Sequence, residues 1–260
     1  MTFLVRIASA LKRRTAGMQT AFGGTTRAEA AESALMDAIN KYQAKVKFGF
    51  EQFPADSTDA SYGECQRNSC CAGSVKEPNW NNGPRISGPL QCGESGFPCP
   101  YPSDDTASYA ALQKVRTFYQ NRLPLKEEDD HYVLLVTASE PYCRSSSDAC
   151  EQALDAADDL GEMGIRVVVL SVGYQPPANS CLTRISQTGS KLPVPSGLKT
   201  LYTPASVSSL NATVAEIALA LAKTTCTMES WDTPPPDDAQ VMISVGRTSV
   251  PQVEGTAQSG

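Results

Sequence analysis

The sequence predicts an α/β fold: a mostly parallel central sheet flanked by helices, with a disulfide-rich insertion and a short C-terminal β extension. Three observations lead to this prediction. The segment His131–Cys143 opens on an unbroken apolar run, Tyr132–Val136, which is typical of a strand buried on both faces. Ile165–Val172, with the apolar stretch Val167–Leu170 at its centre, is a second buried strand of parallel-sheet type. Between the predicted strands, apolar residues recur every three or four positions, which predicts helices. Strands that alternate with helices are typical of a parallel sheet with right-handed crossovers.

Composition narrows the class of protein. The chain has 260 residues, which suits one large domain with an appendage. Its net charge of −6 argues against a nucleic-acid partner, because such partners select a basic surface. No run of about 18 apolar residues occurs, so no transmembrane helix is expected.

The first half of the chain begins with a short strand, Thr2–Ile7. Thr26–Tyr42 places alanines and Ile39 among charged residues, which predicts an amphipathic helix capped by Thr25 or Thr26. Lys45–Gln52 alternates apolar and polar residues. That period of two predicts a half-exposed strand near a sheet edge.

Helical spacing returns after the insertion. Asp104–Arg122 repeats apolar residues every three or four positions. Ser147–Met163 does the same and should end at Gly164, a residue type favoured after helices. The remaining elements are a short helix, a short strand and the clearest helix of the chain: Cys181–Gln187, Leu198–Tyr202 and Val207–Lys223.

These elements predict a domain over residues 1–226 that contains an insertion at 53–103 rich in Gly, Pro, Ser and Asn. A structureless loop of this length is usually functional or covalently pinned. A proline-rich linker, residues 227–239, follows the domain. Residues 240–260 are expected to form a partial β extension, with a strand at Gln240–Val245, a turn at Gly246–Ser249 and a frayed polar tail.

Nine cysteines indicate an oxidising compartment. Structural zinc is the alternative, but such sites usually combine two C-x2–4-C motifs, and only Cys65 and Cys70 have that spacing here. Cys143 and Cys150 are close enough in sequence to pair locally, and Cys226 is expected to pair with Cys181 or with a cysteine outside this chain. The disulfide candidates are Cys65, Cys70, Cys71, Cys92, Cys99, Cys143, Cys150, Cys181 and Cys226.

The cysteines therefore predict a secreted, periplasmic or cell-surface protein. The N-terminus carries no recognisable signal peptide, because Arg6 interrupts its short apolar run and the basic cluster Lys12–Arg14 follows that run instead of preceding it. The cysteines indicate export, but no export signal is visible. We therefore expect that the true N-terminus lies upstream of Met1.

Five stretches in order carry a family resemblance: FLVRIASAL at Phe3–Leu11, KFGFEQFP at Lys47–Pro54, DTASYAAL at Asp105–Leu112, YVLLVTASEPYC at Tyr132–Cys143 and GIRVVVLSVG at Gly164–Gly173. They resemble the strands and metal-site loops of the von Willebrand factor A (VWA) family, and within it the cysteine-rich proteins exported by bacteria. The resemblance spans nearly the whole chain and implies a Rossmann-like sheet. It also implies a role in adhesion or protein binding.

The family's metal-ion-dependent adhesion site joins a D-x-S-x-S motif, a threonine and an aspartate around a cation, usually magnesium. Only the threonine is retained, as Thr106. The lost ligand positions are Arg6, Ala8, Ala10 and Ala138. Loss of both carboxylates predicts that no metal cofactor is bound, because a hard cation needs charged oxygen ligands. Weak Mg²⁺ binding by a substitute site of Asp104, Asp105 and Glu140 is the alternative.

The resemblance then predicts a non-catalytic interaction module that binds through the insertion and through the site rim: Ser9, Thr106, Ser139 and Glu140. Trp80 and Tyr101 of the insertion are either contact anchors or packing residues. One alternative is a disulfide-stabilised enzyme with an unrecognised site, and another is a structural part of a surface assembly. The enzyme hypothesis is disfavoured because the single histidine, His131, stands at the start of a core strand, away from Ser139.

Overall fold

The chain divides into two compact units, residues 1–225 and 226–260. A computed structural model describes residues 2–7, 16–53, 76–90, 106–122, 125, 130–143, 146–190, 198–223, 244–245 and 248–249. The predicted linker, residues 227–239, lies outside these ranges. In the second unit, β9 (Ser244–Val245) and β10 (Thr248–Ser249) pair antiparallel, so the residues expected to form a turn partly belong to a strand.

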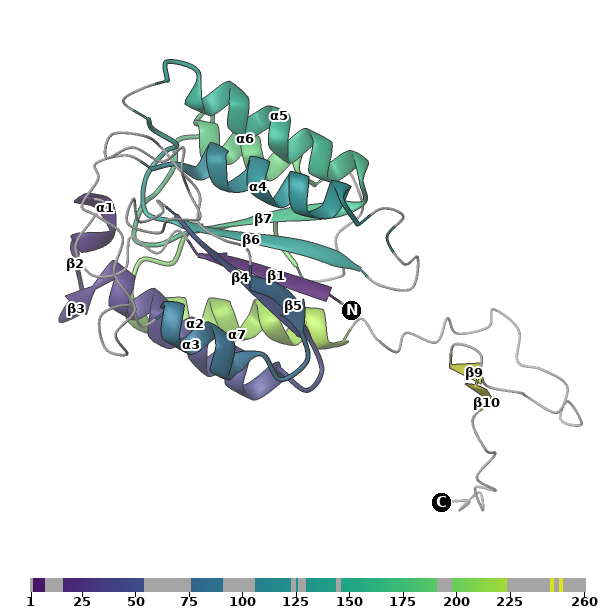
Figure 1. Cartoon of the computed structure of the whole chain (residues 1–260). Helices are drawn as coiled ribbons and strands as arrows, with labels where there is room; N and C mark the ends of the chain where they lie inside the picture. The colour runs from purple at the N-terminus through teal and green to yellow at the C-terminus, as the bar shows by residue number, and fades with distance from the viewer. Residues whose placement is uncertain are drawn as a thin grey trace, which may run out of the picture. The chain divides into compact units, whose positions relative to one another are not determined.

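A six-stranded sheet forms the centre of the first unit, in the order β5-β4-β1-β6-β7-β8 (Figure 1). Its strands are β1 Thr2–Ile7, β4 Lys47–Gln52, β5 Lys76–Asn79, β6 His131–Thr137, β7 Ile165–Ser171 and β8 Leu201–Tyr202. Every neighbouring pair is parallel except β4 with β5, which is antiparallel. The predicted α/β fold is thereby confirmed.

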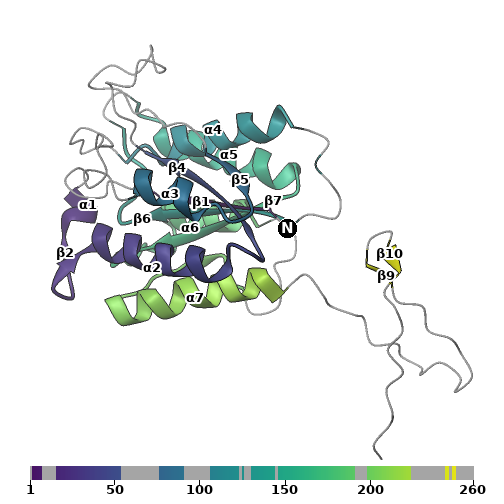
Figure 2. The same cartoon turned by 60° about the horizontal axis from the view of Figure 1, so that its bottom comes forward.

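Helices cover both faces of this sheet (Figure 1). On one face lie α2 (Arg27–Tyr42), α3 (Gly83–Leu90) and α7 (Val207–Lys223), and α2 and α7 run side by side (Figure 2). The other face carries α4, α5 and α6. These helices span Ser108–Gln120, Ala149–Glu162 and Cys181–Thr188. Across the described ranges, no helix is both long and apolar enough to cross a membrane.

Strand β6 explains the central position of its segment, because both of its faces are buried. Leu134 and Val136 belong to the core beneath α2 and α7, while Val133 and Leu135 belong to the core beneath α4 and α5. Side chains alternate across a strand, so an uninterrupted apolar run fills two cores at once. The sequence-based interpretation of this run is confirmed.

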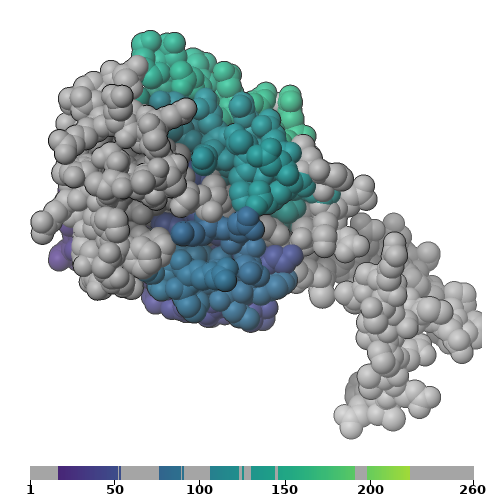
Figure 3. Space-filling view, viewed as in Figure 1, coloured from purple at the N-terminus to yellow at the C-terminus, as the bar shows by residue number. Residues whose placement is uncertain are grey.

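The insertion is more regular than the sequence indicated. Its residues 76–90 form edge strand β5 and helix α3, and they make part of the molecular surface (Figure 3). Ile86 and Leu90 are fully buried in the core. Asn82, between the two elements, donates from Nδ2 to the backbone oxygens of Phe48 and Glu77 at 2.7 and 2.9 Å.

The neighbouring strand β4 also differs from its prediction. It stands next to the edge, but it is not half-exposed, since Glu51 is fully buried along with Phe48 and Phe50. The alternating polar pattern indicated an exposed face. Helices on both faces of the sheet and the additional strand β5 override that pattern.

The start of α2 supports one prediction about stability. Between β1 and α2 the chain forms α1 (Ala16–Gln19) and a hairpin of β2 (Ala21–Phe22) and β3 (Thr25–Thr26). Thr26 caps α2: its Oγ1 accepts from the Glu29 backbone N–H, and the Glu29 carboxylate accepts from the Thr26 N–H.

Thr26→Ala should lower the free energy of unfolding by about 1 kcal/mol, because it removes this reciprocal cap. Chemical denaturation of the oxidised protein measures the change. The matched control is Thr117→Ala, at an exposed position inside α4. That control should change stability by less than about 0.5 kcal/mol. Equal effects of the two substitutions would contradict the role of the cap.

A second prediction concerns Tyr132 in β6. Its side chain is fully buried and its hydroxyl accepts from Arg166 Nη1 at 3.2 Å, while Arg166 also pairs with Asp130 at 3.1 Å. Burial raises the pKa of Tyr132 to about 12, although the charge and the hydrogen bond of Arg166 act to lower this pKa. The folded pKa exceeds the unfolded value of 10.0, so this group's contribution is present below pH 10 and is lost as pH rises toward 12.

Ultraviolet titration of the phenolates tests this. The titration of wild type should include a component near pH 12 from Tyr132, and Tyr132→Phe should lack that component. If Tyr132→Phe removed a component near pH 10 instead, the assignment of the raised pKa would be wrong.

Candidate functional site

The candidate site lies where the parallel strands end. Strand β6 finishes at Thr137, and the chain then turns through residues 138–142. The segment before α4 lies against this turn, because Thr106 and Tyr142 form an antiparallel bridge in which the Tyr142 N–H donates to the Thr106 oxygen at 3.1 Å. The carboxyl ends of parallel strands are the usual ligand sites of open α/β sheets.

Three hydroxyl side chains meet in this turn. Thr106 Oγ1 and Ser139 Oγ are 2.8 Å apart, although they are 33 positions apart in sequence. Thr137 Oγ1 donates to the Ser139 backbone oxygen at 2.9 Å and accepts from its N–H at 3.3 Å. The predicted rim residues Thr106 and Ser139 therefore do lie together.

Ala138 stands beside these hydroxyls and has only 3% of its surface exposed. The segment containing Gly17 packs on it closely: a Cβ at Gly17 would lie 3.0 Å from the Ala138 backbone oxygen. Arg27 fixes this arrangement by donating to the backbone oxygens of Gly17 at 3.2 Å and Gly173 at 2.5 Å. Burial lowers the pKa of Arg27. Neither Gly17 nor Arg27 belongs to a motif that the sequence analysis identified.

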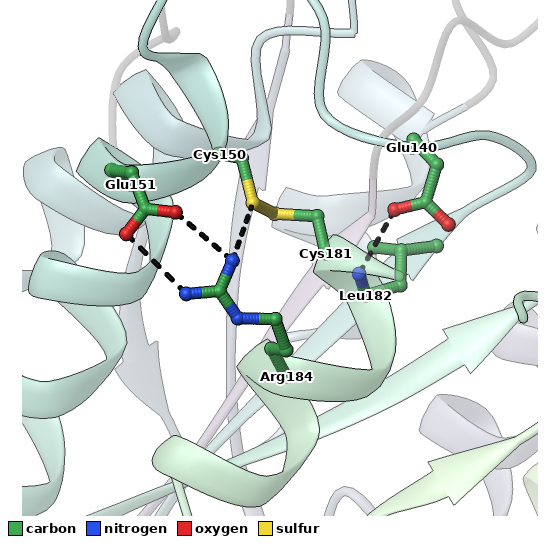
Figure 4. A network of polar contacts seen from close by, with 6 residues as sticks. All are labelled: Glu140, Cys150, Glu151, Cys181, Leu182 and Arg184. Carbon is green, nitrogen blue, oxygen red and sulfur yellow. Dashed lines mark hydrogen bonds and ion pairs between the residues drawn. A yellow bond between two sulfur atoms is a disulfide. The ribbon is translucent and has the colours of Figure 1, made fainter. Parts of the chain in front are cut away.

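Glu140 is turned toward helix α6 (Figure 4). Its Oε2 accepts from the Leu182 backbone N–H at 3.0 Å, and its Oε1 accepts from the Tyr174 hydroxyl at 3.1 Å. Burial raises the pKa of Tyr174, and the hydrogen bond to Glu140 adds to that shift. The carboxylate thus holds the first turn of α6. The other acids of the suggested substitute site, Asp104 and Asp105, lie outside the described residues.

The described part of the site fits a hard cation poorly. Ala138 supplies no side-chain oxygen, and both Glu140 oxygens already accept hydrogen bonds from protein groups. Within the described ranges, no three His, Cys, Asp or Glu side chains gather in a way that could hold a metal ion. The hydroxyls of Thr106 and Ser139 remain, and neutral hydroxyls alone do not balance a divalent charge.

Tyr142 is a site residue that the sequence analysis missed. Its side chain is 51% exposed, although its backbone is paired with Thr106. The sequence feature that could have identified Tyr142 is an aromatic residue directly after Pro141, at the end of the turn. Trp80 of the insertion is also exposed, at 44%, and Lys47 Nζ lies 5.2 Å from its ring centre. Tyr101 lies outside the described residues.

A disulfide joins Cys150 to Cys181, with 5.7 Å between their Cα atoms (Figure 4). The expected local pair of Cys143 with Cys150 is therefore wrong, and so is the pairing of Cys181 with Cys226. Helix packing explains the correction, because α5 and α6 lie against each other and bring distant cysteines together. Cys143 is disulfide-bonded too, to a partner outside the described residues. The remaining predicted candidates, Cys65, Cys70, Cys71, Cys92, Cys99 and Cys226, also lie outside them.

Solved structures share the fold of this chain at low sequence identity. The pilus adhesin SpaC from Lactobacillus rhamnosus GG matches with a TM-score of 0.57 and 13% identity, over 86% of this chain and 30% of the adhesin. BatB from Bacteroides thetaiotaomicron matches at 0.51 and 14%, over 84% and 97%. The SpRpn10 VWA domain matches at 0.50 and 13%, over 82% and 92%. The chain has a VWA-like fold.

The likeness to these structures is one of fold. No family profile and no curated protein matches the chain. The chain spans less than a third of the length of the SpaC adhesin, so that adhesin consists largely of other parts.

The VWA-like fold locates the motif positions inferred from the sequence. Arg6 is the penultimate residue of β1, level with Glu51 of β4 and Leu135 of β6. The D-x-S-x-S pattern would therefore begin at the carboxyl end of β1, beside the turn that contains Ala138. Its later positions, Ala8, Ser9 and Ala10, lie outside the described residues.

Proposed function

We propose that this chain is a VWA-like protein-interaction module that works outside the cytoplasm and docks its partner without a metal ion. Two residues at the carboxyl end of the sheet, Ser139 and Tyr142, form its docking face, and the buried Thr106, which is 4% exposed, positions Ser139 through their hydroxyl contact. The proposed partner is a protein or another cell-surface ligand.

One observation carries the proposal: the hydroxyls of Thr106 and Ser139 meet at 2.8 Å beside a buried alanine, where the family pattern has an aspartate. Two of the predicted rim hydroxyls thus lie together, and the position of the family's aspartate carries an uncharged alanine. Tyr142 is exposed and its backbone pairs with Thr106, which supports direct contact with a partner, because tyrosine is enriched among residues that dominate binding energy.

The position of His131 supports a non-catalytic role. It lies at the amino end of β6 and Ser139 follows the carboxyl end. A strand of seven residues separates them by about 20 Å, too far for a nucleophile and its base. His131 is the chain's only histidine.

The compartment is supported by the disulfides. Disulfides form and persist in secreted and periplasmic proteins and are rare in the cytosol. Cys150 and Cys181 form a disulfide, and Cys143 belongs to another. Pilus adhesins among the structures of similar fold are consistent with a cell-surface role.

Photo-crosslinking tests the proposal. Benzoylphenylalanine replaces Tyr142 in one variant and Leu219, an exposed residue of α7, in the matched control. Each purified protein is illuminated with the exported fraction of the source organism, with and without EDTA. The Tyr142 variant should yield one defined adduct that EDTA leaves unchanged, and the Leu219 variant should not yield it.

Two results would count against the proposal. Identical adducts from both positions would mean that the docking face is not selective. Loss of the Tyr142 adduct in EDTA, with recovery in Mg²⁺, would mean that binding depends on a metal.

A further inference from the structure

Both cysteines of the Cys150–Cys181 disulfide stand at helix starts. Cys150 is the second residue of α5, and Cys181 is the first residue of α6. Both are half-buried, whereas Cys143 is only 2% exposed. The positive end of a helix dipole favours a thiolate over a thiol, so each sulfur is placed where reduction to an anion is favoured.

A guanidinium adds to this effect on one side. Arg184 Nη1 lies 4.0 Å from Cys150 Sγ, and the same group pairs with Glu151 at 2.9 and 3.4 Å (Figure 4). Glu151 holds the guanidinium in place and offsets part of its charge. Arg184 is nevertheless the cation in contact with the sulfur, and it stabilises Cys150 as the leaving thiolate in disulfide exchange.

The disulfide also connects to the turn after β6. Leu182 follows Cys181 directly, and its N–H donates to Glu140 Oε2 at 3.0 Å. Glu140 belongs to the same turn as Ser139 and Tyr142. The disulfide thus ties α5 to the start of α6, and the start of α6 in turn contacts Glu140 (Figure 4).

We propose that the Cys150–Cys181 disulfide is a reducible switch that controls the turn at residues 138–142. A dithiol protein or small dithiol is the reductant. Its first thiolate attacks Cys181 Sγ, the disulfide bond breaks, and Cys150 leaves as a thiolate. The second thiolate of the dithiol then attacks the mixed disulfide and releases Cys181. The dithiol ends as a disulfide, and the two cysteines take up the two protons.

Reduction removes the covalent tie and leaves the first turn of α6 held by Glu140, the Ser180 cap, the Arg184–Glu151 ion pair and the buried side chain of Leu182. The turn at residues 138–142 is expected to open more often in that state. Control of partner binding rests on the proposed docking function, whereas the redox step and the loosening of the turn do not depend on it.

Reduction kinetics test the first half of the proposal. The oxidised full chain is treated with dithiothreitol, quenched by alkylation at timed intervals and mapped by mass spectrometry. Cys150 and Cys181 should become alkylated at least about tenfold faster than Cys143. Arg184→Gln should slow their reduction by about threefold to tenfold.

The matched control is Arg116→Gln, which breaks a comparable ion pair with Asp159 between α4 and α5 and should leave the rate unchanged. Equal rates for Cys150 and Cys143, or no slowing by Arg184→Gln, would overturn the switch.

Hydrogen exchange tests the second half. A Cys150→Ser/Cys181→Ser variant, compared with oxidised wild type, should exchange the amide hydrogens of Ala138, Ser139, Glu140 and Tyr142 about tenfold faster. Helix α7 is the internal control and should be unchanged. Unchanged exchange at residues 138–142 would overturn the coupling. If exchange at the turn is unchanged but the Tyr142 adduct forms and resists EDTA, only the switch is rejected. If exchange at the turn increases but the Tyr142 adduct does not form, only the docking function is rejected.

Discussion

Replacing Leu134 by alanine is expected to remove about 3 to 5 kcal/mol from the free energy of unfolding. Leu134 lies in the middle of β6 and is 1% exposed. It borders a small apolar void shared with Ile39, Phe48 and Ile217. Truncation removes most of a buried leucine side chain and enlarges a void that rigid neighbours cannot fill, so the cost falls near the top of the usual range.

Chemical denaturation with the disulfides intact measures this loss. Leu219→Ala on α7 is the matched control, because Leu219 is 40% exposed. The control should cost less than about 1 kcal/mol. A similar small cost for Leu134→Ala would contradict the central place of β6 between two cores.

Ala138→Asp is expected to lower the free energy of unfolding by about 3 kcal/mol at neutral pH, because it places an unpaired carboxylate at a buried position. Burial should raise the pKa of the new carboxyl group above its unfolded value. The loss should therefore be full above that raised pKa and shrink as pH falls through it. Denaturation at about pH 7 and at about pH 4 measures the trend.

Ala138→Asn separates charge from volume in this experiment, since it adds similar bulk without ionising. It should lose less stability than Ala138→Asp at neutral pH and show no such pH trend. Saturating Mg²⁺ should leave the Ala138→Asp deficit in place, because a single restored carboxylate does not complete the adhesion site. Recovery of stability in Mg²⁺ would show that the remaining ligands are already present.

Local sequence patterns predicted the elements of the sheet and its helices closely. The continuous apolar run of β6 predicted a strand that is buried on both faces. The predicted helix Val207–Lys223 has the same first and last residues as α7. Thr26 was one of two predicted caps, and it forms the full capping box. These features depend on short-range spacing, which a single sequence displays.

Features that depend on tertiary packing could not be predicted from the sequence. The β5–α3 unit lies within a stretch rich in proline and glycine, and only Ile86 and Leu90 hint at its buried face. The Cys150–Cys181 pair spans 31 positions and depends on the packing of α5 against α6. Likewise, nothing in the sequence assigns Glu140 to the start of α6, since that contact joins residues 42 positions apart.

Titration calorimetry with Mg²⁺ and Mn²⁺ on the oxidised, folded chain tests the central claim most directly. A metal-independent docking face predicts no binding heat and no shift in melting temperature at millimolar metal. Stoichiometric binding that is lost on Thr106→Ala would contradict the claim, because it would mean that acids near Thr106 rebuild the adhesion site.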